Sequence, residues 1–260
     1  MIKDVFASIG AAARKLLTNF GAVLIALLFY AALWLTGYAF FNTGLATQWQ
    51  VALNIAILPL AALILFFLLQ AMGLSYVRIG VGAGYLLKRA LKDFWKLLVI
   101  SLPLALLAWA LVKLFGYLDA KFLASVTKQA NRWPEMAVTI ARWLLLYGLL
   151  PLWAIHLWMT AMREGLAAAF KGIGRSLVAA LSPRSVLVYV IVLAVLGALA
   201  YFIAFTKTPI QSDWAELWVV GTRFALVLLL PFFAWMLTLG AMAEMATRRA
   251  LGDLEAVPRA

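Results

Sequence analysis

Six long apolar runs constrain the fold of this sequence more than any other feature. Each run is long enough to cross the hydrocarbon core of a bilayer, which an α-helix does with about 20 residues. The runs are continuous and rich in Leu and Ala, whereas a membrane β-barrel strand shows about ten residues of alternating hydrophobicity. We therefore predict an all-α membrane protein with six transmembrane helices, at residues 20–41, 51–76, 97–118, 137–160, 185–205 and 217–242.

The composition agrees with a protein that has the bilayer as its solvent. Hydrophobic residues make up 67% of the chain, charged residues 12%, and the mean hydropathy is +1.02, which is far from a soluble domain. The chain contains no cysteine, which excludes disulfides, thiolate metal sites and cysteine nucleophiles. The first apolar run is too long for the core of a signal peptide, so we expect it to remain as a helix.

The net charge of +12 is unevenly distributed along the chain. In a soluble protein this excess of Lys and Arg would suggest nucleic acid, but here the basic residues lie between the apolar runs. We predict anionic lipid headgroups as partners, and no nucleic acid. Most Lys and Arg residues lie before the first run, after the sixth, or in the connections that follow the second and fourth. Both termini are therefore predicted to be cytoplasmic.

Two further patterns mark the opposite, outer side of the membrane. The spacing of Leu118, Phe122 and Val126 predicts a helix on the outer surface, in the connection after the third run. Tryptophans that would form an outer aromatic belt are Trp49, Trp133, Trp143, Trp214 and Trp218.

Similar motifs recur in every second apolar run. Ala-Met recurs near the end of these runs, in Gln70-Ala71-Met72, Thr160-Ala161-Met162 and Gly240-Ala241-Met242. Leu-Pro recurs upstream, in Leu58-Pro59, Leu150-Pro151 and Leu230-Pro231. The pattern predicts a single integral membrane domain, 1–260, built from pseudo-repeats at 1–78, 79–163 and 164–260. Chance matches in a Leu-rich sequence are the alternative interpretation.

A basic, amphipathic stretch precedes each predicted hairpin. The apolar residues at helical spacing are Val5, Phe6, Ile9, Leu16 and Leu17, then Leu87, Leu91, Phe94 and Leu98, then Leu166, Phe170, Ile173, Leu177 and Leu181. The basic residues assigned to the membrane surface are Lys88, Arg89, Lys92, Lys171 and Arg175. We expect three helices in the headgroup plane with their apolar faces toward the acyl chains. Simple loops that obey the positive-inside rule are the alternative.

Few residues inside the predicted helices can carry chemistry. His156, the only histidine, lies in the fourth helix, where an imidazole can relay protons, contact a ligand, or bond to a neighbouring helix. Arg142 and Arg223 lie near the outer surface and can bind a lipid phosphate or an anionic substrate, or extend toward the headgroups. Glu164 and Glu244 are expected to pair with a neighbouring arginine or with a lysine of the amphipathic stretches.

The second, fourth and sixth predicted spans each contain one proline, namely Pro59, Pro151 and Pro231. Each removes one backbone hydrogen bond and favours a kink. Interrupted helices form the substrate site in some transporters, so the prolines join His156 and the two arginines as candidate ligand-binding positions. Kinks that only shape the bundle are the alternative.

The sequence carries no constellation for catalysis. It contains no second histidine, no Gly-x-Ser-x-Gly and no acidic cluster that could activate water. We predict that the protein is not an enzyme, and we assign no catalytic residue, cofactor or metal ligand.

The fourth and fifth helices carry a family resemblance. Leu149-Leu150-Pro151 is followed by Arg163-Glu164-Gly165-Leu166, by Arg175-Ser176-Leu177 and by a new apolar span. This order resembles bacterial six-helix inner-membrane proteins of the YciC-like and glycerophosphodiester phosphodiesterase membrane-domain type. Leu177 stands where an aromatic residue is usual. The resemblance implies a fold and a place in the bacterial cytoplasmic (inner) membrane rather than an activity.

A second resemblance concerns the segment 164–183. It is similar in outline to the coupling loop of ABC importer permeases, where a Glu-Ala-Ala opening is followed by a glycine and a closing Leu-Pro. Here Gly165 replaces the first alanine, Phe170 holds the glycine position, and the closing pair is split in Leu181-Ser182-Pro183.

The expected function is therefore non-enzymatic. The chain is predicted to be a scaffold, or a lipid- or partner-binding component of a membrane assembly, together with other membrane subunits. The alternative is a transporter or lipid-translocating protein with a central cavity, which includes an ABC-type permease subunit.

Overall fold

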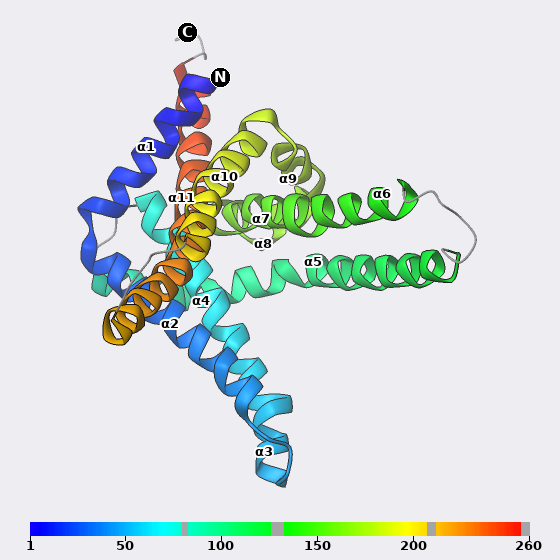
Figure 1. Ribbon diagram of the computed structural model, residues 1–260. Coiled ribbons are helices and arrows are strands. Elements are labelled where there is room, and N and C mark those ends of the chain that lie inside the picture. Colours follow the sequence, from blue (N-terminus) through cyan, green and yellow to red (C-terminus); the bar gives the residue numbers. More distant parts are fainter. Residues whose placement is uncertain (80–82, 126–132, 207–211, 256–260) are drawn as a thin grey trace. The chain divides into compact units, whose positions relative to one another are not determined.

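The computed structural model describes residues 1–79, 83–125, 133–206 and 212–255, and every element within these ranges is a helix (Figure 1). The six predicted spans are confirmed, and the chain is a multi-pass membrane protein. Val126 of the predicted outer-surface helix lies outside the described residues. The helices long and apolar enough to cross a membrane are Phe20–Asn42, Gln48–Tyr76, Gly84–Lys121, Trp133–Glu164, Pro183–Phe205 and Asp213–Thr247.

The helices form two compact units. One contains Met1–Phe94 and Leu187–Ala260, and the other contains Trp95–Val186. The predicted pseudo-repeats divide the chain at other positions and stay a prediction. In chain order the elements are α1 (Ile2–Thr18), α2 (Phe20–Asn42), α3 (Gln48–Ala52), the π-helix η1 (Leu53–Ile57), α4 (Leu58–Ile79), α5 (Ala83–Ser125), α6 (Trp133–Arg142), the π-helix η2 (Trp143–Leu149), α7 (Leu150–Glu164), α8 (Leu166–Lys171), α9 (Ile173–Ala180), α10 (Pro183–Phe205) and α11 (Asp213–Glu255).

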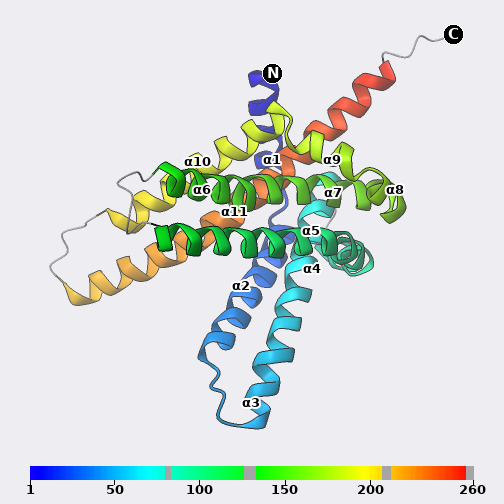
Figure 2. The ribbon, with the colours of Figure 1, turned by 90° about the vertical axis from the view of Figure 1, so that its right-hand side faces the viewer.

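In the first unit, α2 and α4 form an antiparallel hairpin and lie side by side in both views (Figures 1 and 2). The hairpin turns at α3, where Thr47 and Gln50 form a capping box. The Gln50 N–H donates to Thr47 Oγ1 over 3.3 Å, and Gln50 Oε1 accepts from the Thr47 N–H over 3.0 Å. Asn54 Nδ2 donates to the carbonyl oxygen of Thr43 over 2.7 Å, which ties η1 to the end of α2.

The core of the first unit lies where α4 packs against α11. Gly73 permits a close approach, because a Cβ there would lie 2.9 Å from Leu239 Cδ1 and 3.1 Å from Met236 Sδ. Met72 is fully buried in this core, and the Trp235 indole N–H donates to Gln70 Oε1 beside it. A glycine opposite flexible Leu and Met side chains thus sets the distance between the two helices.

Helix α1, predicted to lie in the headgroup plane, packs on α11. Its buried residues are Val5, Ser8, Ala12 and Leu16. Phe6 and Leu17, which the sequence placed on the same apolar face, are 57% and 83% exposed. The apolar residues of this helix are therefore divided between a face that contacts protein and a face that is open to lipid.

Two contacts at Lys15 hold the end of α1. Its ammonium group lies 3.1 Å from Glu244 Oε2 on α11, which confirms the pairing expected for this acid. Its carbonyl oxygen accepts a hydrogen bond from the Tyr76 hydroxyl on α4. The Thr18 hydroxyl donates to the same carbonyl oxygen over 3.2 Å, so a side chain of α4 and one of α1 both bond to the last turn of α1.

Reversing one charge of the Lys15–Glu244 pair is expected to destabilise the protein, and reversing both charges is expected to restore its stability. Lys15→Glu and Glu244→Lys should each lower the free energy of unfolding by about 1 kcal/mol, because like charges then face each other at a half-exposed site. The double exchange should restore most of the loss, measured by denaturant titration in mixed micelles. Losses that add in the double variant would show that the two side chains do not interact.

In the second unit, α6, η2 and α7 form one continuous helical stretch, and α8 and α9 pack on α7. The chain reverses at Gly165, whose φ of +92° favours glycine because a Cβ is strained there. An alanine at this position, as in the coupling-loop pattern of ABC permeases, would meet that strain.

The second amphipathic stretch is not a separate helix, because it forms the beginning of α5. Its buried residues are Leu86, Ala90 and Asp93, and Leu91, which the sequence placed on the apolar face, is 51% exposed. The 43 residues of α5 span about 65 Å at 1.5 Å per residue, about twice the hydrocarbon thickness, so part of α5 extends beyond the membrane core.

Candidate functional site

Three side chains of α7, those of Trp153, His156 and Trp158, each bond to a serine. The Trp153 indole N–H donates to Ser176 Oγ of α9 over 3.0 Å, and the Trp158 indole N–H donates to Ser101 Oγ of α5 over 2.7 Å. His156 Nε2 lies 3.0 Å from Ser185 Oγ of α10. Because a polar group in an apolar setting is costly without a partner, these bonds fix the neighbouring segments around α7.

The serine that contacts His156 belongs to the helix cap of α10. Ser182 precedes Pro183, the first residue of the helix, and its Oγ accepts from the Ser185 N–H over 3.4 Å. The Ser182 hydroxyl also donates to Ser185 Oγ over 2.9 Å. His156 therefore lies level with the beginning of α10.

Arg142 is the last residue of α6, before η2 in the same helical stretch, and it pairs with Asp119 of α5. The guanidinium carbon also lies 5.7 Å from the centre of the Phe115 ring, a cation–π distance. Nε of Arg142 is buried and has no hydrogen-bond partner among the described residues. The side chain predicted to reach a headgroup or an anion is thus held by an acid of its own unit and is 31% exposed.

Two of the three prolines follow π-helices. The π-helix η1 ends at Ile57, and Pro59 is the second residue after it. Pro151 has the same position relative to η2, which ends at Leu149. A wider turn makes room for the proline ring and for the missing N–H. In each case the residue before the proline donates its N–H five residues back, Leu58 to Leu53 and Leu150 to Leu145.

At Pro231 the helix α11 remains α-helical. The missing N–H of residue 231 leaves the carbonyl of Val227 without its usual donor. The Tyr30 hydroxyl donates to the next carbonyl, that of Leu228, over 2.9 Å, and the Tyr30 ring lies 5.3 Å from the Phe232 ring. At Pro231, therefore, a side chain from α2 supplies a hydrogen-bond donor beside the proline. At Pro59 and Pro151 the helix instead widens into a π-helix before the proline.

Within the second unit, the structure does not bring the two polar candidates Arg142 and His156 together. Arg142 and His156 lie about 20 Å apart along one helical stretch, at 1.5 Å per residue. Pro151 lies between them on the same stretch. Arg223, Pro231 and Pro59 belong to the other unit. The two best polar candidates therefore cannot contact the same small ligand.

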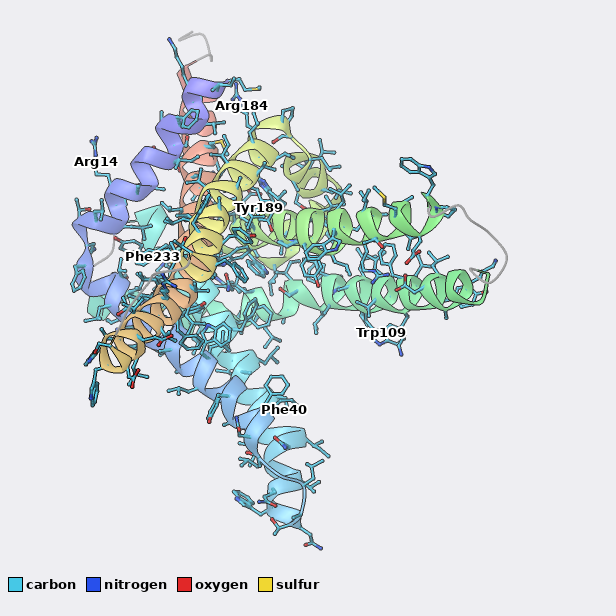
Figure 3. All side chains as sticks on the ribbon, in the orientation of Figure 1. Arg14, Phe40, Trp109, Arg184, Tyr189 and Phe233 are labelled. Carbon is cyan, nitrogen blue, oxygen red and sulfur yellow. The ribbon has the colours of Figure 1, made fainter. Side chains whose placement is uncertain are left out.

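The basic residues assigned to the membrane surface differ in their surroundings. Arg89 lies 3.9 Å from the buried carboxylate of Asp93, within the same helix. Lys88 and Lys92 are exposed, as are Lys171 and Arg175. Arg14 of α1 is also exposed and points away from α11 (Figure 3).

Sequence reasoning missed the polar partners. Ser101, Ser176 and Ser185 are buried and complete the bonds of α7, and Asp119 completes the pair of Arg142. The signal for Ser185 was present in Ser182-Pro183, a typical helix start with a serine three residues on. The other serines carry no local signal.

Within the described ranges, no group of three or more His, Cys, Asp or Glu side chains is placed to hold a metal ion. No family model, no curated protein and no solved structure matches the chain.

Proposed function

We propose that the chain is a non-enzymatic membrane component that binds lipid and other membrane subunits. One observation carries the proposal. Only 11% to 33% of the most apolar 18-residue window of each span is buried inside the protein. Most of the apolar side chains therefore need a cover of lipid or of partner helices, which is what a scaffold offers.

The polar side chains support the same proposal. The hydrogen-bonding groups of His156, Trp153 and Trp158 contact serines of neighbouring helices, and Arg142 contacts Asp119. These contacts hold helices together and do not converge on a common site. A transporter would instead place polar groups around one substrate path.

Three features support the threefold repeat within this proposal. The alanines of the Ala-Met motif, Ala71, Ala161 and Ala241, are each 0% exposed. The first two Leu-Pro motifs follow π-helices in the same register. The amphipathic stretches bury residues at matching intervals, namely Val5, Ala12 and Leu16, then Leu86, Asp93 and Leu97, then Ala169, Ser176 and Ala180.

The proposal places the protein in the bacterial cytoplasmic membrane with both termini in the cytoplasm. The asymmetry of Lys and Arg supports this orientation. The five tryptophans of the predicted outer belt are 60% to 73% exposed, as an interfacial position requires.

Native mass spectrometry of the protein, extracted gently from its own membrane, tests the proposal. A stoichiometric protein partner or a retained lipid supports a binding component. A monomer that retains neither would argue against it, because the exposed apolar surface would then have no specific occupant.

The π-helices favour a second candidate, a transporter or lipid-translocating protein, since such segments are frequent at functional sites. A combined variant His156→Ala, Arg142→Gln and Arg223→Gln distinguishes the two. Partner and lipid retention should survive in a scaffold if the variant still folds by circular dichroism. Loss of ion- or lipid-flux in vesicles, with the partners retained, would favour the transporter.

A further inference from the structure

The segment α8–α9 lies level with the beginning of α10. It connects α7 to α10, two candidate spans, and the contact of His156 with Ser185 sets the beginning of α10 level with His156. The rest of α7, to Glu164, therefore extends about 12 Å past that level at 1.5 Å per residue. Ser176 of α9 lies beside Trp153, within one turn of His156, so α9 lies at the same level.

The packing of α8–α9 is opposite to that of an ordinary surface helix. The residues that it buries are small, Ala169, Ser176 and Ala180, at 0%, 6% and 0% exposure. A hydrogen bond from the Ser176 N–H to the Gly172 carbonyl oxygen, 2.9 Å, continues the helical spacing across the break between α8 and α9. The small residues allow close packing on α7. Leu166, Ile173 and Leu177 are half-buried, and Phe170, Val178 and Leu181 are left on the outer side.

The outer side combines apolar and basic residues. Phe170, Val178 and Leu181 are 41%, 71% and 57% exposed, which an aqueous surface disfavours. Lys171 and Arg175 are exposed one helical turn apart, on the adjoining stripe of the surface. This surface fits a boundary between an apolar medium and a negatively charged layer. The headgroup region of an anionic leaflet provides both.

The other two amphipathic stretches do not bury small residues alone against protein. At the corresponding buried positions the beginning of α5 has Leu86 and Leu97, and α1 has Val5 and Leu16. Those stretches therefore use large apolar side chains to contact protein. Only α8–α9, among the described stretches of this kind, contacts protein at these three positions through small residues alone.

We propose that the surface formed by Phe170, Lys171, Arg175, Val178 and Leu181 binds the phosphate headgroups of anionic phospholipids. The two cations contact the phosphate, and the three apolar side chains enter the upper acyl chains. This inference rests on the proposed function, and it names the lipid class that the binding component recognises and the part of the chain that recognises it.

A single label reports on this surface, because the chain has no native cysteine. The full chain carrying Val178→Cys, with an environment-sensitive fluorophore, is titrated with anionic phospholipid in nonionic micelles. Zwitterionic phospholipid and inorganic phosphate serve as separate arms. We expect a blue shift with the anionic lipid alone, because only this ligand supplies both a net negative charge and acyl chains.

The charge is tested by K171Q/R175Q in the labelled background. The midpoint of the titration should move about 30-fold to higher lipid, from about fivefold for each near-surface cation. The control is K113Q/K121Q, a pair of exposed lysines on α5 that are not assigned to the membrane surface, which should leave the midpoint unchanged.

Three outcomes overturn the inference. They are an equal response of the label to zwitterionic lipid, a shift of the midpoint by the control pair as large as that by K171Q/R175Q, and shielding of the label from both lipid and water by a bound protein. Each of them leaves the partner analysis by native mass spectrometry intact, so failure of the lipid surface is distinguishable from failure of the binding-component function.

Discussion

Trp158→Ala is expected to lower the free energy of unfolding by about 3–5 kcal/mol, the range for removal of a buried Trp or Phe side chain. Trp158 is 4% exposed and donates to Ser101, which is itself 8% exposed. The variant leaves a cavity and removes the partner of a buried hydroxyl. Denaturant titration in mixed micelles measures the loss.

Two variants test the packing at this position. Trp158→Phe keeps part of the ring but removes the hydrogen bond to Ser101 and some buried atoms, so it should lose about 1–3 kcal/mol, less than Trp158→Ala. Trp109→Ala is the matched control, because Trp109 is 63% exposed and lies on the side of α5 away from α6 (Figure 3). A loss at Trp109 equal to that at Trp158 would contradict the packing described for α7.

Gly73→Leu is expected to separate α4 from α11 and to lower the free energy of unfolding by about 1–3 kcal/mol, the range for overpacking. The first added atom already meets Leu239 Cδ1 at 2.9 Å and Met236 Sδ at 3.1 Å. A larger side chain has no room unless the helices move. Thermal unfolding of the purified protein in nanodiscs provides the measurement.

Two further substitutions serve as controls for the close approach of α4 and α11 at Gly73. Gly73→Ala should be nearly neutral, because both close atoms end flexible side chains and alanine favours a helix by about 1 kcal/mol over glycine. Gly37→Leu on α2 adds the same side chain where no atom lies within 4 Å of the new Cβ, and stability should not fall. If Gly73→Leu lowers the stability no more than Gly37→Leu does, then α4 and α11 do not approach closely at Gly73.

The spans were predictable because hydropathy is a local property. A window of about 20 residues contains the whole signal for a transmembrane helix, and it does not depend on what the helix contacts. The pairing of Glu244 was predictable in kind, because a carboxylate near basic stretches finds a cation, although the sequence did not single out Lys15.

The contacts of the candidate site were not predictable, because they join residues far apart in sequence. Ser101 carries no mark that distinguishes it from other serines, and only the packing of α5 on α7 pairs it with Trp158. The faces of the amphipathic stretches were ambiguous for a related reason. Helical spacing indicates that Val5 and Phe6 are both apolar, but it does not indicate which of them meets protein and which meets lipid.

The π-helices at η1 and η2 have a consequence for how the two spans tolerate change. A π-helix accommodates one residue more than the α-helix it interrupts, so everything beyond it is turned by about 100° about the helix axis. The stretches on either side of Leu58-Pro59, and of Leu150-Pro151, therefore follow two helical wheels and not one. In an alignment of related chains, single-residue gaps should fall in these short segments, and permitted substitutions should change phase across them.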